Sequence, residues 1–341
     1  MDKPSISYLT FNTRRNGGNK VIFEHVNRLR KKGYSIRLYS ILGKQPDWFT
    51  LDVKIQSLFS FFKSSFTDIV VATFWPTAYI IFLLRVKHKF HFVQGWEEDF
   101  HTNIILKKLA RYAIRLPLEK ITISKFLERQ INLYGNKTKP IHRIRHYEVD
   151  KSIFQPRRVS FNKESSKNIH ILSVISRYKW YKGVDILHQI IVKLKKSYSN
   201  YDFTLVSNEQ KPYSLIFDHF ISNPSPHHLA KIYQNSDFLL VTSRTEGFFI
   251  PGLEAMATGC ILVTTNCGGI EEYAKDKKNA VILKDIRDLW RKNIIESLMK
   301  NRKLKGEIIA DGYKTVNCYK WKNSIEDLEK IYLGQNLSKS F

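Results

Sequence analysis

Runs of apolar side chains broken by polar segments are clearest in the C-terminal half of the chain. Residues 238–241 are apolar without interruption, which is typical of a strand buried on both faces of a parallel sheet. After a polar break, Pro251 begins a run of helical spacing that ends at Gly259, where a helix favours a left-handed residue. A second strand is expected at 261–264 and a further helix start at Ile270. This order predicts a crossover unit of a doubly wound α/β sheet.

The rest of the chain repeats this alternation. Short apolar runs predict strands at residues 5–11, 35–39, 69–73, 89–94, 120–124, 169–175, 201–207 and 220–222. Helical spacing or a helix start follows at 21–32, from 76, from 125, at 184–196, from 226 and at 319–333. Strands that alternate with helices favour parallel sheets, so the chain is expected to be an α/β protein.

Length and apolar content favour two domains. At 341 residues the chain exceeds the size at which one core usually keeps growing, and 43% hydrophobic residues suffice for two cores. A charged, Ser-containing segment at 157–167 lacks apolar periodicity and is the expected linker. We therefore expect domains at 1–158 and 159–318. The three cysteines have no metal-type spacing and are interpreted as reduced thiols of a cytosolic protein.

The charge balance points to an acidic partner. Lys and Arg number 56 against 31 Asp and Glu, a formal net charge of +25. Because no zinc knuckle, aromatic-interleaved RNA motif or basic zipper is present, a nucleic-acid partner is not expected. An anionic membrane surface is favoured, since it attracts exposed basic residues by about 1 kcal/mol each. A nonspecific solvated surface is the alternative.

The sequence predicts neither export nor a membrane span. Residues 1–11 lack an uninterrupted apolar signal core. The most apolar window, 69–84, contains Pro76 and is shorter than the roughly 20 residues that span a bilayer. We interpret this window as a buried strand and helix, with membrane insertion as the alternative. The expected location is cytoplasmic, with peripheral binding at the inner face of the membrane.

Two carboxylates bracket the loop and helix start of the C-terminal crossover unit. Glu246 and Glu254 have seven residues between them. Ligands of open α/β sheets bind beyond the carboxyl ends of the strands, so Glu246 is expected in that crevice and Glu254 near the helix N-terminus. Carboxylates there suit sugar hydroxyls, and backbone N–H groups at a helix start suit phosphate. Alternatively, Glu254 is an acid favoured by the helix dipole and Glu246 an ordinary surface residue.

The segment EGFFIPGLEAMATGCILVTTNCGGIEEY closely resembles the donor-binding segment of retaining glycosyltransferases of family 4, which have the GT-B fold. The resemblance implies two Rossmann-like doubly wound domains facing a cleft, with a C-terminal helix at about 319–341 packing back on the first domain. It also implies that Glu246 contacts hydroxyls of the donor sugar and Glu254 holds the ribose. The backbone expected near the donor diphosphate belongs to Phe248, Ile250, Pro251, Gly252 and Leu253.

The same resemblance covers the loop after the strand at 169–175. Arg177 and Lys182 match the family positions that bind the donor diphosphate. Cations suit this role because two negative charges must be held and the leaving group gains charge as the glycosidic bond breaks. The alternative interpretation is that two basic residues fall in this loop by chance.

The first domain offers weaker signals. NGGNKVIFEHVNRLRKKGYSIRLYS looks like the family's first Gly-rich loop and helix, which would place Gly17 and Gly18 beside the cleft; a plain tight turn is the alternative. Many family members carry a His near the reacting carbon, where this chain has Gln94. Gln94 could bond the sugar, Glu97 or Glu98 could orient the acceptor, or all three could be structural.

No metal and no further cofactor is expected. Three-residue spacing places His88 and His91 on opposite faces of a strand, so they are not expected to bind one metal ion together. The pairs His142 with His146 and His227 with His228 are not expected to form a metal site either. The acids at 97–99 lack the Asp-x-Asp arrangement of metal-dependent glycosyltransferases. The co-substrate implied by the resemblance is a nucleoside diphosphate sugar.

The expected function is therefore that of a metal-independent, retaining glycosyltransferase of hexosyltransferase type. It would move a sugar from a nucleoside diphosphate to a glycan or lipid-linked acceptor in surface polysaccharide biosynthesis, by front-face displacement. One alternative is a nucleotide-sugar epimerase or phosphorylase on the same fold. Another is a basic protein that binds membrane or nucleic acid without catalysis.

Overall fold

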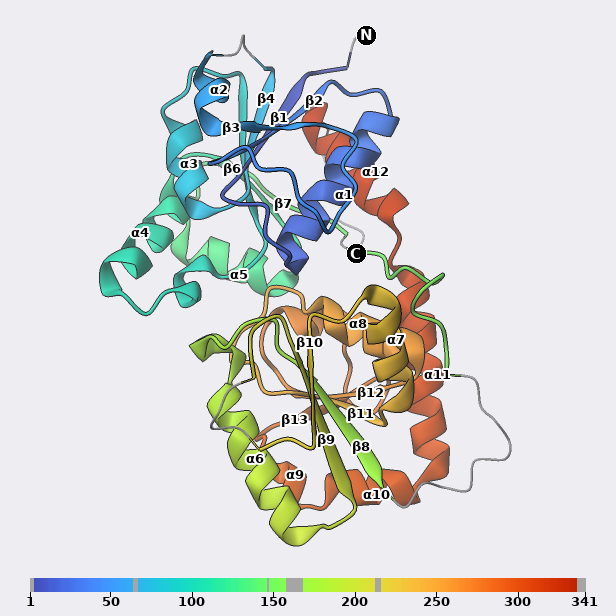
Figure 1. The fold of residues 1–341 in the computed structure, drawn as a ribbon. Helices are drawn as coiled ribbons and strands as arrows, with labels where there is room; N and C mark the ends of the chain where they lie inside the picture. Colours follow the sequence, from blue (N-terminus) through green and yellow to red (C-terminus); the bar gives the residue numbers. More distant parts are fainter. Residues whose placement is uncertain (1–2, 64–66, 146, 158–167, 212–215, 336–341) are drawn as a thin grey trace. The chain divides into compact units, whose positions relative to one another are not determined.

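A computed structural model describes residues 3–63, 67–145, 147–157, 168–211 and 216–335 (Figure 1). The chain divides into two compact units. Unit 1 comprises Met1–Tyr147 with Lys320–Phe341, and unit 2 comprises Glu148–Tyr319. Each unit contains its own parallel sheet with helices, so the predicted doubly wound α/β architecture is confirmed.

Unit 1 is built on a seven-stranded sheet of order β3-β2-β1-β4-β5-β6-β7. Its strands are β1 (Ile6–Thr10), β2 (Ile36–Ser40), β3 (Ile55–Ser57), β4 (Ile69–Ala72), β5 (His88–Val93), β6 (Glu119–Thr122) and β7 (Ile141–Arg143). The central strands β1 and β4 are buried along their whole length, which explains their continuous apolar sequences. The strand order reverses between β1 and β4, and ligands of such sheets bind at the carboxyl edge near this reversal.

The helices of unit 1 begin at clear sequence signals. They are α1 (Gly17–Lys31), α2 (Leu58–Lys63), α3 (Trp75–Phe82), η1 (Glu97–Phe100), α4 (Ile104–Arg115), α5 (Lys125–Tyr134) and α12 (Trp321–Tyr332). Asn16, Asn103 and Ser124 cap three of them with side-chain oxygens. The cap at Asn16 makes α1 begin at Gly17, four residues before the predicted start.

The C-terminal helix α12 belongs to unit 1 and packs beside α1 (Figure 1). The hydroxyls of Tyr332 and Tyr8 lie 2.7 Å apart in the core. Asp327 accepts hydrogen bonds from the guanidinium of Arg145 at 2.6 and 2.9 Å. A chain segment far from β1 in sequence thus completes the core of unit 1.

Unit 2 repeats the plan with a six-stranded sheet of order β10-β9-β8-β11-β12-β13. Its strands are β8 (Ile169–Val174), β9 (Tyr201–Ser207), β10 (His219–Ser222), β11 (Phe238–Val241), β12 (Ile261–Thr265) and β13 (Val281–Leu283). Its helices are η2 (Trp180–Lys182), α6 (Val184–Ser197), α7 (Pro226–Asn235), α8 (Ile250–Thr258), η3 (Gly269–Glu272), α9 (Asp288–Arg291), α10 (Ile294–Lys300) and α11 (Arg302–Cys318). Here the strand order reverses between β8 and β11.

The structure corrects one element of the C-terminal crossover unit. The helix expected from Ile270 is a single 3₁₀ turn, η3. The residue before this turn, Gly268, has φ of 93°, and the turn ends at Tyr273. By contrast, α8 has Pro251 in its first turn and ends at Gly259, whose φ is 82°, as the sequence predicted.

The first boundary between unit 1 and unit 2 lies earlier in the chain than the sequence suggested. Residues before 158 already pack on unit 2, since the ring of Phe154 lies 6.1 Å from that of Tyr233. The backbone N–H of Arg157 donates to the carbonyl of Thr258 at 3.0 Å. The units therefore divide after Tyr147. Residues 158–167, most of the expected linker, lie outside the described residues.

Candidate functional site

The reversal of strand order in unit 2 brings two loops together at the carboxyl edge of the sheet. The loop after β8 leads through η2 to Lys182, and the loop after β11 carries Glu246. The ammonium of Lys182 lies 2.7 Å from Oε1 of Glu246. Strands β8 and β11 pair directly through Ile171 and Phe238, which is why two side chains 64 residues apart in the sequence meet here.

Lys182 and Glu246 form a polar cluster with Ser243. The Ser243 hydroxyl donates to the same Glu246 oxygen at 2.6 Å. The Lys182 and Glu246 side chains are only 16% and 9% exposed. Burial opposes the charge of Lys182, but Glu246 and Tyr181 outweigh it and raise the pKa of the lysine. The site therefore holds a lysine that stays protonated at neutral pH beside a carboxylate.

The backbone of Glu246 is held from both sides by the loop after β12. Its N–H donates to the carbonyl of Cys267 at 2.7 Å, and its carbonyl accepts from the N–H of Gly269 at 2.7 Å. A β-carbon on Gly269 would lie 1.9 Å from the carbonyl oxygen of Gly247. The predicted Gly-Gly turn thus allows a backbone approach that no other residue permits. Burial and the charge of Glu246 raise the pKa of the Cys267 thiol to about 12, so this cysteine is not a nucleophile at neutral pH.

Arg244 locks the loop after β11 to the segment around Lys182. Its guanidinium forms a bidentate pair with Asp185 at 2.9 and 2.6 Å and lies over the ring of Trp180. Its backbone N–H donates to the carbonyl of Tyr181 at 2.8 Å. The Lys182–Glu246 pair therefore rests on a pre-formed scaffold.

Glu254, the second acid of the spaced pair, lies on α8 and is only 7% exposed. Its Oε2 accepts a hydrogen bond from the Tyr233 hydroxyl at 3.3 Å. Burial raises the pKa of Tyr273, and the charges of Glu246 and Glu254 raise it further. Both acids thus belong to the same region of unit 2.

The first turn of α8 is more tightly packed than the sequence suggested. Phe249 precedes it with φ of 67°, a left-handed conformation unusual for this residue. The Tyr273 hydroxyl donates to the Phe249 carbonyl at 2.7 Å, and a β-carbon on Gly252 would lie 2.1 Å from that hydroxyl. The N–H of Gly252 donates to the same carbonyl at 3.1 Å. This N–H is therefore already used within the turn.

The other predicted donor-binding residues fall into two groups. Phe248 and Leu253 are buried, and the Phe248 ring packs against Tyr273, so their side chains support the loop. Ile250 and Pro251 are half-buried at the start of α8. Arg177 is half-buried in the loop after β8, and its charge acts on Tyr181, next to Lys182.

In unit 1, the structure brings Gly18 and Gln94 together. A β-carbon on Gly18 would lie 3.4 Å from Nε2 of Gln94. Gly17 and Gly18 form the first turn of α1, whose cap Asn16 accepts from the N–H of Asn19 at 2.8 Å. The loops after β1 and β5 therefore meet at the carboxyl edge of the sheet.

The acids near Gln94 are engaged with other parts of unit 1. Glu97 is buried with Oε2 3.7 Å from Nε2 of His91, and burial raises the pKa of Glu97. Glu98 accepts two hydrogen bonds from Arg111 at 2.7 and 2.5 Å. Glu97 and Glu98 are thus held by contacts within unit 1, whereas Gln94 lies beside Gly18.

Sequence reasoning missed two side chains that hold the acids. Ser243 lies three residues before Glu246 in the polar loop, so its position carried a signal. Tyr233 is 21 residues from Glu254 on another helix. No local pattern predicts that contact, because it depends on how α7 packs against α8.

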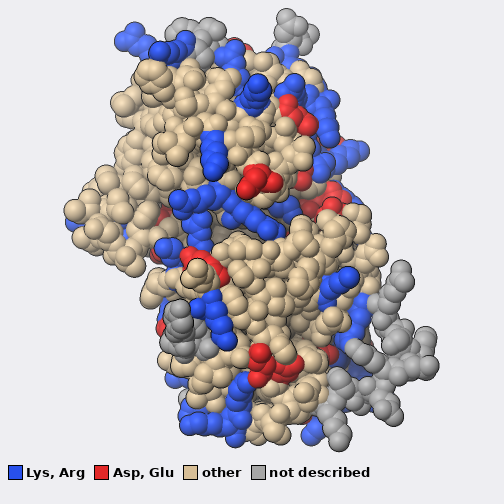
Figure 2. All heavy atoms as spheres, in the orientation of Figure 1, with Lys and Arg blue, Asp and Glu red and all other residues tan. Residues whose placement is uncertain are grey.

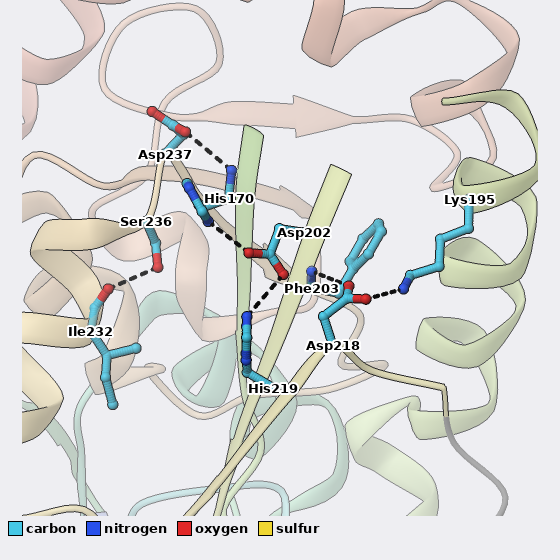
Figure 3. Close-up of polar contacts among 9 residues, drawn as sticks. All are labelled: His170, Lys195, Asp202, Phe203, Asp218, His219, Ile232, Ser236 and Asp237. Atoms are coloured by element: carbon cyan, nitrogen blue, oxygen red, sulfur yellow. Dashed lines mark hydrogen bonds and ion pairs between the residues drawn. The ribbon is translucent and has the colours of Figure 1, made fainter. Parts of the chain in front are cut away.

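A second polar cluster lies at the opposite, amino-terminal ends of the strands of unit 2 (Figure 3). Asp202 at the start of β9 lies between His170 of β8, at 3.1 Å, and His219 of β10, at 3.3 Å. Asp237 accepts from the N–H of His170 at 3.1 Å. This cluster joins neighbouring strands. Among the described residues, no group of three or more His, Cys, Asp or Glu side chains could hold a metal ion.

Comparison with known proteins gives these sites a context. Residues 156–315 match the family model of glycosyl transferases group 1. An uncharacterized glycosyltransferase of Haemophilus influenzae is 25% identical over 83% of this chain and 85% of its own length. The N,N'-diacetylbacillosaminyl-diphospho-undecaprenol alpha-1,3-N-acetylgalactosaminyltransferase of Campylobacter jejuni is 24% identical over 71% of this chain and 67% of its own.

Solved structures share the fold. Sucrose-phosphate synthase of Thermosynechococcus elongatus superposes with a TM-score of 0.80 at 14% identity, over 97% of this chain and 99% of its own. Anabaena HepE in complex with UDP-glucose gives 0.73 at 13% identity, over 97% and 98%. The two sheets of seven and six parallel strands match these neighbours and form the two-domain GT-B fold.

Proposed function

We propose that this chain, whose residues 156–315 match the family of glycosyl transferases group 1, is a glycosyltransferase that transfers a sugar from a nucleoside diphosphate sugar bound at the Lys182–Glu246 pair of unit 2. The observation that carries the proposal is the meeting of a protonated lysine and a carboxylate at the strand-order reversal. Open α/β sheets bind nucleotides at this place. The HepE structure, solved with UDP-glucose, supports the donor class.

Lys182 binds the donor diphosphate. An ammonium group has three donors, and one of them points to Glu246 in this structure. Its other donors and its charge suit the leaving group, whose negative charge grows as the glycosidic bond breaks. Arg177, in the same loop, supplies a second cation. With these cations in place, the reaction needs no metal ion.

Glu246 orients the sugar. Its Oε1 already accepts from Lys182 and Ser243, and carboxylate oxygens have further acceptor capacity for sugar hydroxyls. Glu254 binds the ribose, held by Tyr233. We further propose that transfer of a hexose-type unit proceeds by front-face displacement with retention at the anomeric carbon, with Glu246 and Glu254 acting in donor binding.

Unit 1 binds the acceptor, with Gln94 beside Gly18 as the hydrogen-bonding group. A glycan or lipid-linked acceptor of surface polysaccharide biosynthesis fits the net charge of +25 and the undecaprenol-linked acceptor in the name of the Campylobacter relative. In the part of the chain that the structure describes, no helix is long and apolar enough to cross a membrane. We propose a cytoplasmic enzyme that binds the membrane surface peripherally.

The test is acceptor-dependent release of a nucleoside diphosphate. The protein is incubated with a panel of nucleoside diphosphate sugars and with polyprenyl-linked acceptors, and NMR of the product reads the anomeric configuration. We expect Glu246→Gln to lower kcat about 100-fold and Lys179→Ala, an exposed lysine of the same loop, to leave it unchanged. An altered nucleotide sugar without release of diphosphate would indicate an epimerase, and dependence on phosphate a phosphorylase. Release that both variants leave unchanged would contradict the proposed site.

A further inference from the structure

Helix α4 of unit 1 exposes a cluster of large apolar side chains. Ile104 and Ile105 are each 64% exposed. Leu106, Leu109 and Tyr112 on the same helix are exposed as well. In the orientation shared by Figures 1 and 2, the surface over α4 at the left edge of unit 1 is mostly uncharged. Clustered apolar exposure of this kind marks a surface that contacts another molecule.

Residue spacing divides α4 into three strips, because residues three or four apart share a helix face. The first strip is buried and comprises Ala110, Ala113 and Ile114; the second is apolar and exposed and comprises Ile105, Leu109 and Tyr112. The third is basic and exposed and comprises Lys108, Arg111 and Arg115, and the exposed Ile104 precedes it at the start of the helix. The apolar and basic strips lie side by side on the outer surface. This is the arrangement of a helix that rests at a lipid–water boundary.

The outer face of α4 is held in place by contacts with its neighbours. Asn103 caps the helix by accepting from the N–H of Ile105 at 2.9 Å. The Tyr79 hydroxyl of α3 donates to the carbonyl of Leu109 at 2.8 Å. Because these contacts fix both the start and the middle of the helix, the exposed strips form a pre-ordered surface. Binding there does not require the helix to fold first.

The charge of this surface is positive even after its ion pair is counted. Glu98 offsets Arg111 through their bidentate pair. The guanidinium of Arg115 lies 5.2 Å from the Tyr112 ring centroid, which leaves its charge at the border of the apolar strip. Lys108 is exposed on the basic strip. An anionic partner is therefore complementary to this face.

We propose that the outer face of α4 binds the surface of an anionic lipid bilayer. The apolar strip enters the acyl-chain boundary, and Lys108 and Arg115 reach the lipid phosphates along their apolar stems. This inference deepens the proposed function, since it names the surface by which the enzyme reaches a lipid-linked acceptor. A second copy of the chain docked through the same face would bring two basic strips together, which disfavours self-association.

Co-sedimentation with vesicles tests the proposal on the full chain, without donor or acceptor. One vesicle type is phosphatidylcholine alone and the other contains roughly one third phosphatidylglycerol. We expect the wild-type protein to bind the anionic vesicles preferentially and less at high salt. The double variant Ile104→Ser/Ile105→Ser is expected to reduce the partition coefficient at least about tenfold.

A matched control comes from α2, which exposes Phe59 at 68% and Phe62 at 60% on the same unit. Phe59→Ser/Phe62→Ser is expected to leave vesicle binding unchanged. A third variant, Lys108→Ser, keeps the apolar strip and is expected to weaken binding to anionic vesicles alone. An unchanged Tm shows that each variant is folded.

Three results would overturn the proposal. One is equal binding of the wild-type protein to both vesicle types, and another is wild-type binding by the Ile104→Ser/Ile105→Ser variant. The third is a change of oligomeric state in that variant, by light scattering, with vesicle binding intact. Since no nucleotide sugar is present, loss of vesicle binding leaves the proposed donor site untouched. Failure of donor binding likewise leaves the vesicle result standing.

Discussion

The carbonyl oxygen of Thr242 lies where a side chain on Gly183 would begin. A β-carbon at Gly183 would be 1.9 Å from that oxygen, and the glycine has φ of 63°. This contact presses the segment that ends in Lys182 against the loop that leads to Glu246. The ion pair between Lys182 and Glu246 therefore depends on the absence of a side chain at position 183.

Gly183→Ala should disrupt the candidate site. The β-carbon would collide with the backbone, and the left-handed conformation adds a cost of its own, of order 1 kcal/mol. We expect a lower Tm and weaker donor binding. Gly33→Ala is the matched control, because Gly33 has φ of 87° and no described residue beyond its two chain neighbours comes within 4 Å of the point that its β-carbon would occupy. Equal losses of Tm in both variants would show that the clash with Thr242 is relieved at no cost.

Tyr233→Phe should weaken the hold on Glu254. The substitution removes the 3.3 Å hydrogen bond that a buried carboxylate accepts, at a cost of about 1 kcal/mol. We expect a lower Tm together with a several-fold higher KM for the donor sugar. Tyr313→Phe, a tyrosine of α11 beside Gly259, serves as the comparison and should leave the KM unchanged. A Tyr233→Phe variant with the wild-type KM would argue against a role of Glu254 in donor binding.

Lys120 should make the stability of unit 1 depend on pH. The residue is only 2% exposed, its ammonium donates to the carbonyls of Leu116 and Leu118, and burial lowers its pKa to about 7. Between pH 7 and the ordinary pKa of 10.5, the unfolded chain holds a proton that the folded chain has released. The unfolded state then binds more protons, so the stability from this group rises with pH.

The check compares the Tm of the wild-type protein with that of Lys120→Met at pH 7 and pH 9. Since the variant lacks this titration, the Tm of the wild type should rise by a few degrees relative to the variant as the pH increases. Lys193→Met, which replaces a lysine on α6 in unit 2, provides the control. The difference in Tm between the wild type and this variant should not change with pH. A constant difference between wild type and Lys120→Met would contradict the lowered pKa.

Asp327→Asn should loosen the C-terminal helix from unit 1. Asp327 is buried, and its carboxylate receives both the guanidinium and the backbone N–H of Arg145. Loss of that charge removes the buried carboxylate that pairs with the guanidinium, at a cost of about 2 kcal/mol. We expect a Tm several degrees lower and earlier proteolysis of the C-terminal segment. The adjacent Glu326→Gln removes a 3.9 Å surface pair with Lys322 and a weaker charge that acts on Arg145, so it should have a smaller effect; identical behaviour of the two variants would refute the anchoring role.

Strands with long apolar runs were predictable from the sequence. The strands at 201–207 and 238–241 have the predicted bounds, and Ser225 caps α7 as expected by accepting from the N–H of His228. The edge strands β3, β7 and β13 have three residues each. Three residues are too few to show a period, so those strands arise from pairing with a neighbour rather than from a local pattern.

The candidate site was predictable in part. Residue types and spacing pointed to Lys182 and Glu246, but their contact depends on the adjacency of β8 and β11, which is a property of strand order. Glu97 and Glu98 could not be assigned from sequence, because their partners His91 and Arg111 lie on other elements. Burial and tertiary pairing decided what these acids do.

The most direct test of the Lys182–Glu246 site is a calorimetric titration with a nucleoside diphosphate sugar, beginning with UDP-glucose and continuing with the donor that raises the Tm most. Lys182→Ala removes the cation and leaves Glu246 without its ion-pair partner, so we expect its Kd to be at least about tenfold higher than that of the wild type. Lys179→Ala, four residues from Gly183 in the same loop, should retain the wild-type Kd. Equal affinity of the wild type and Lys182→Ala for that donor would contradict donor binding at this pair.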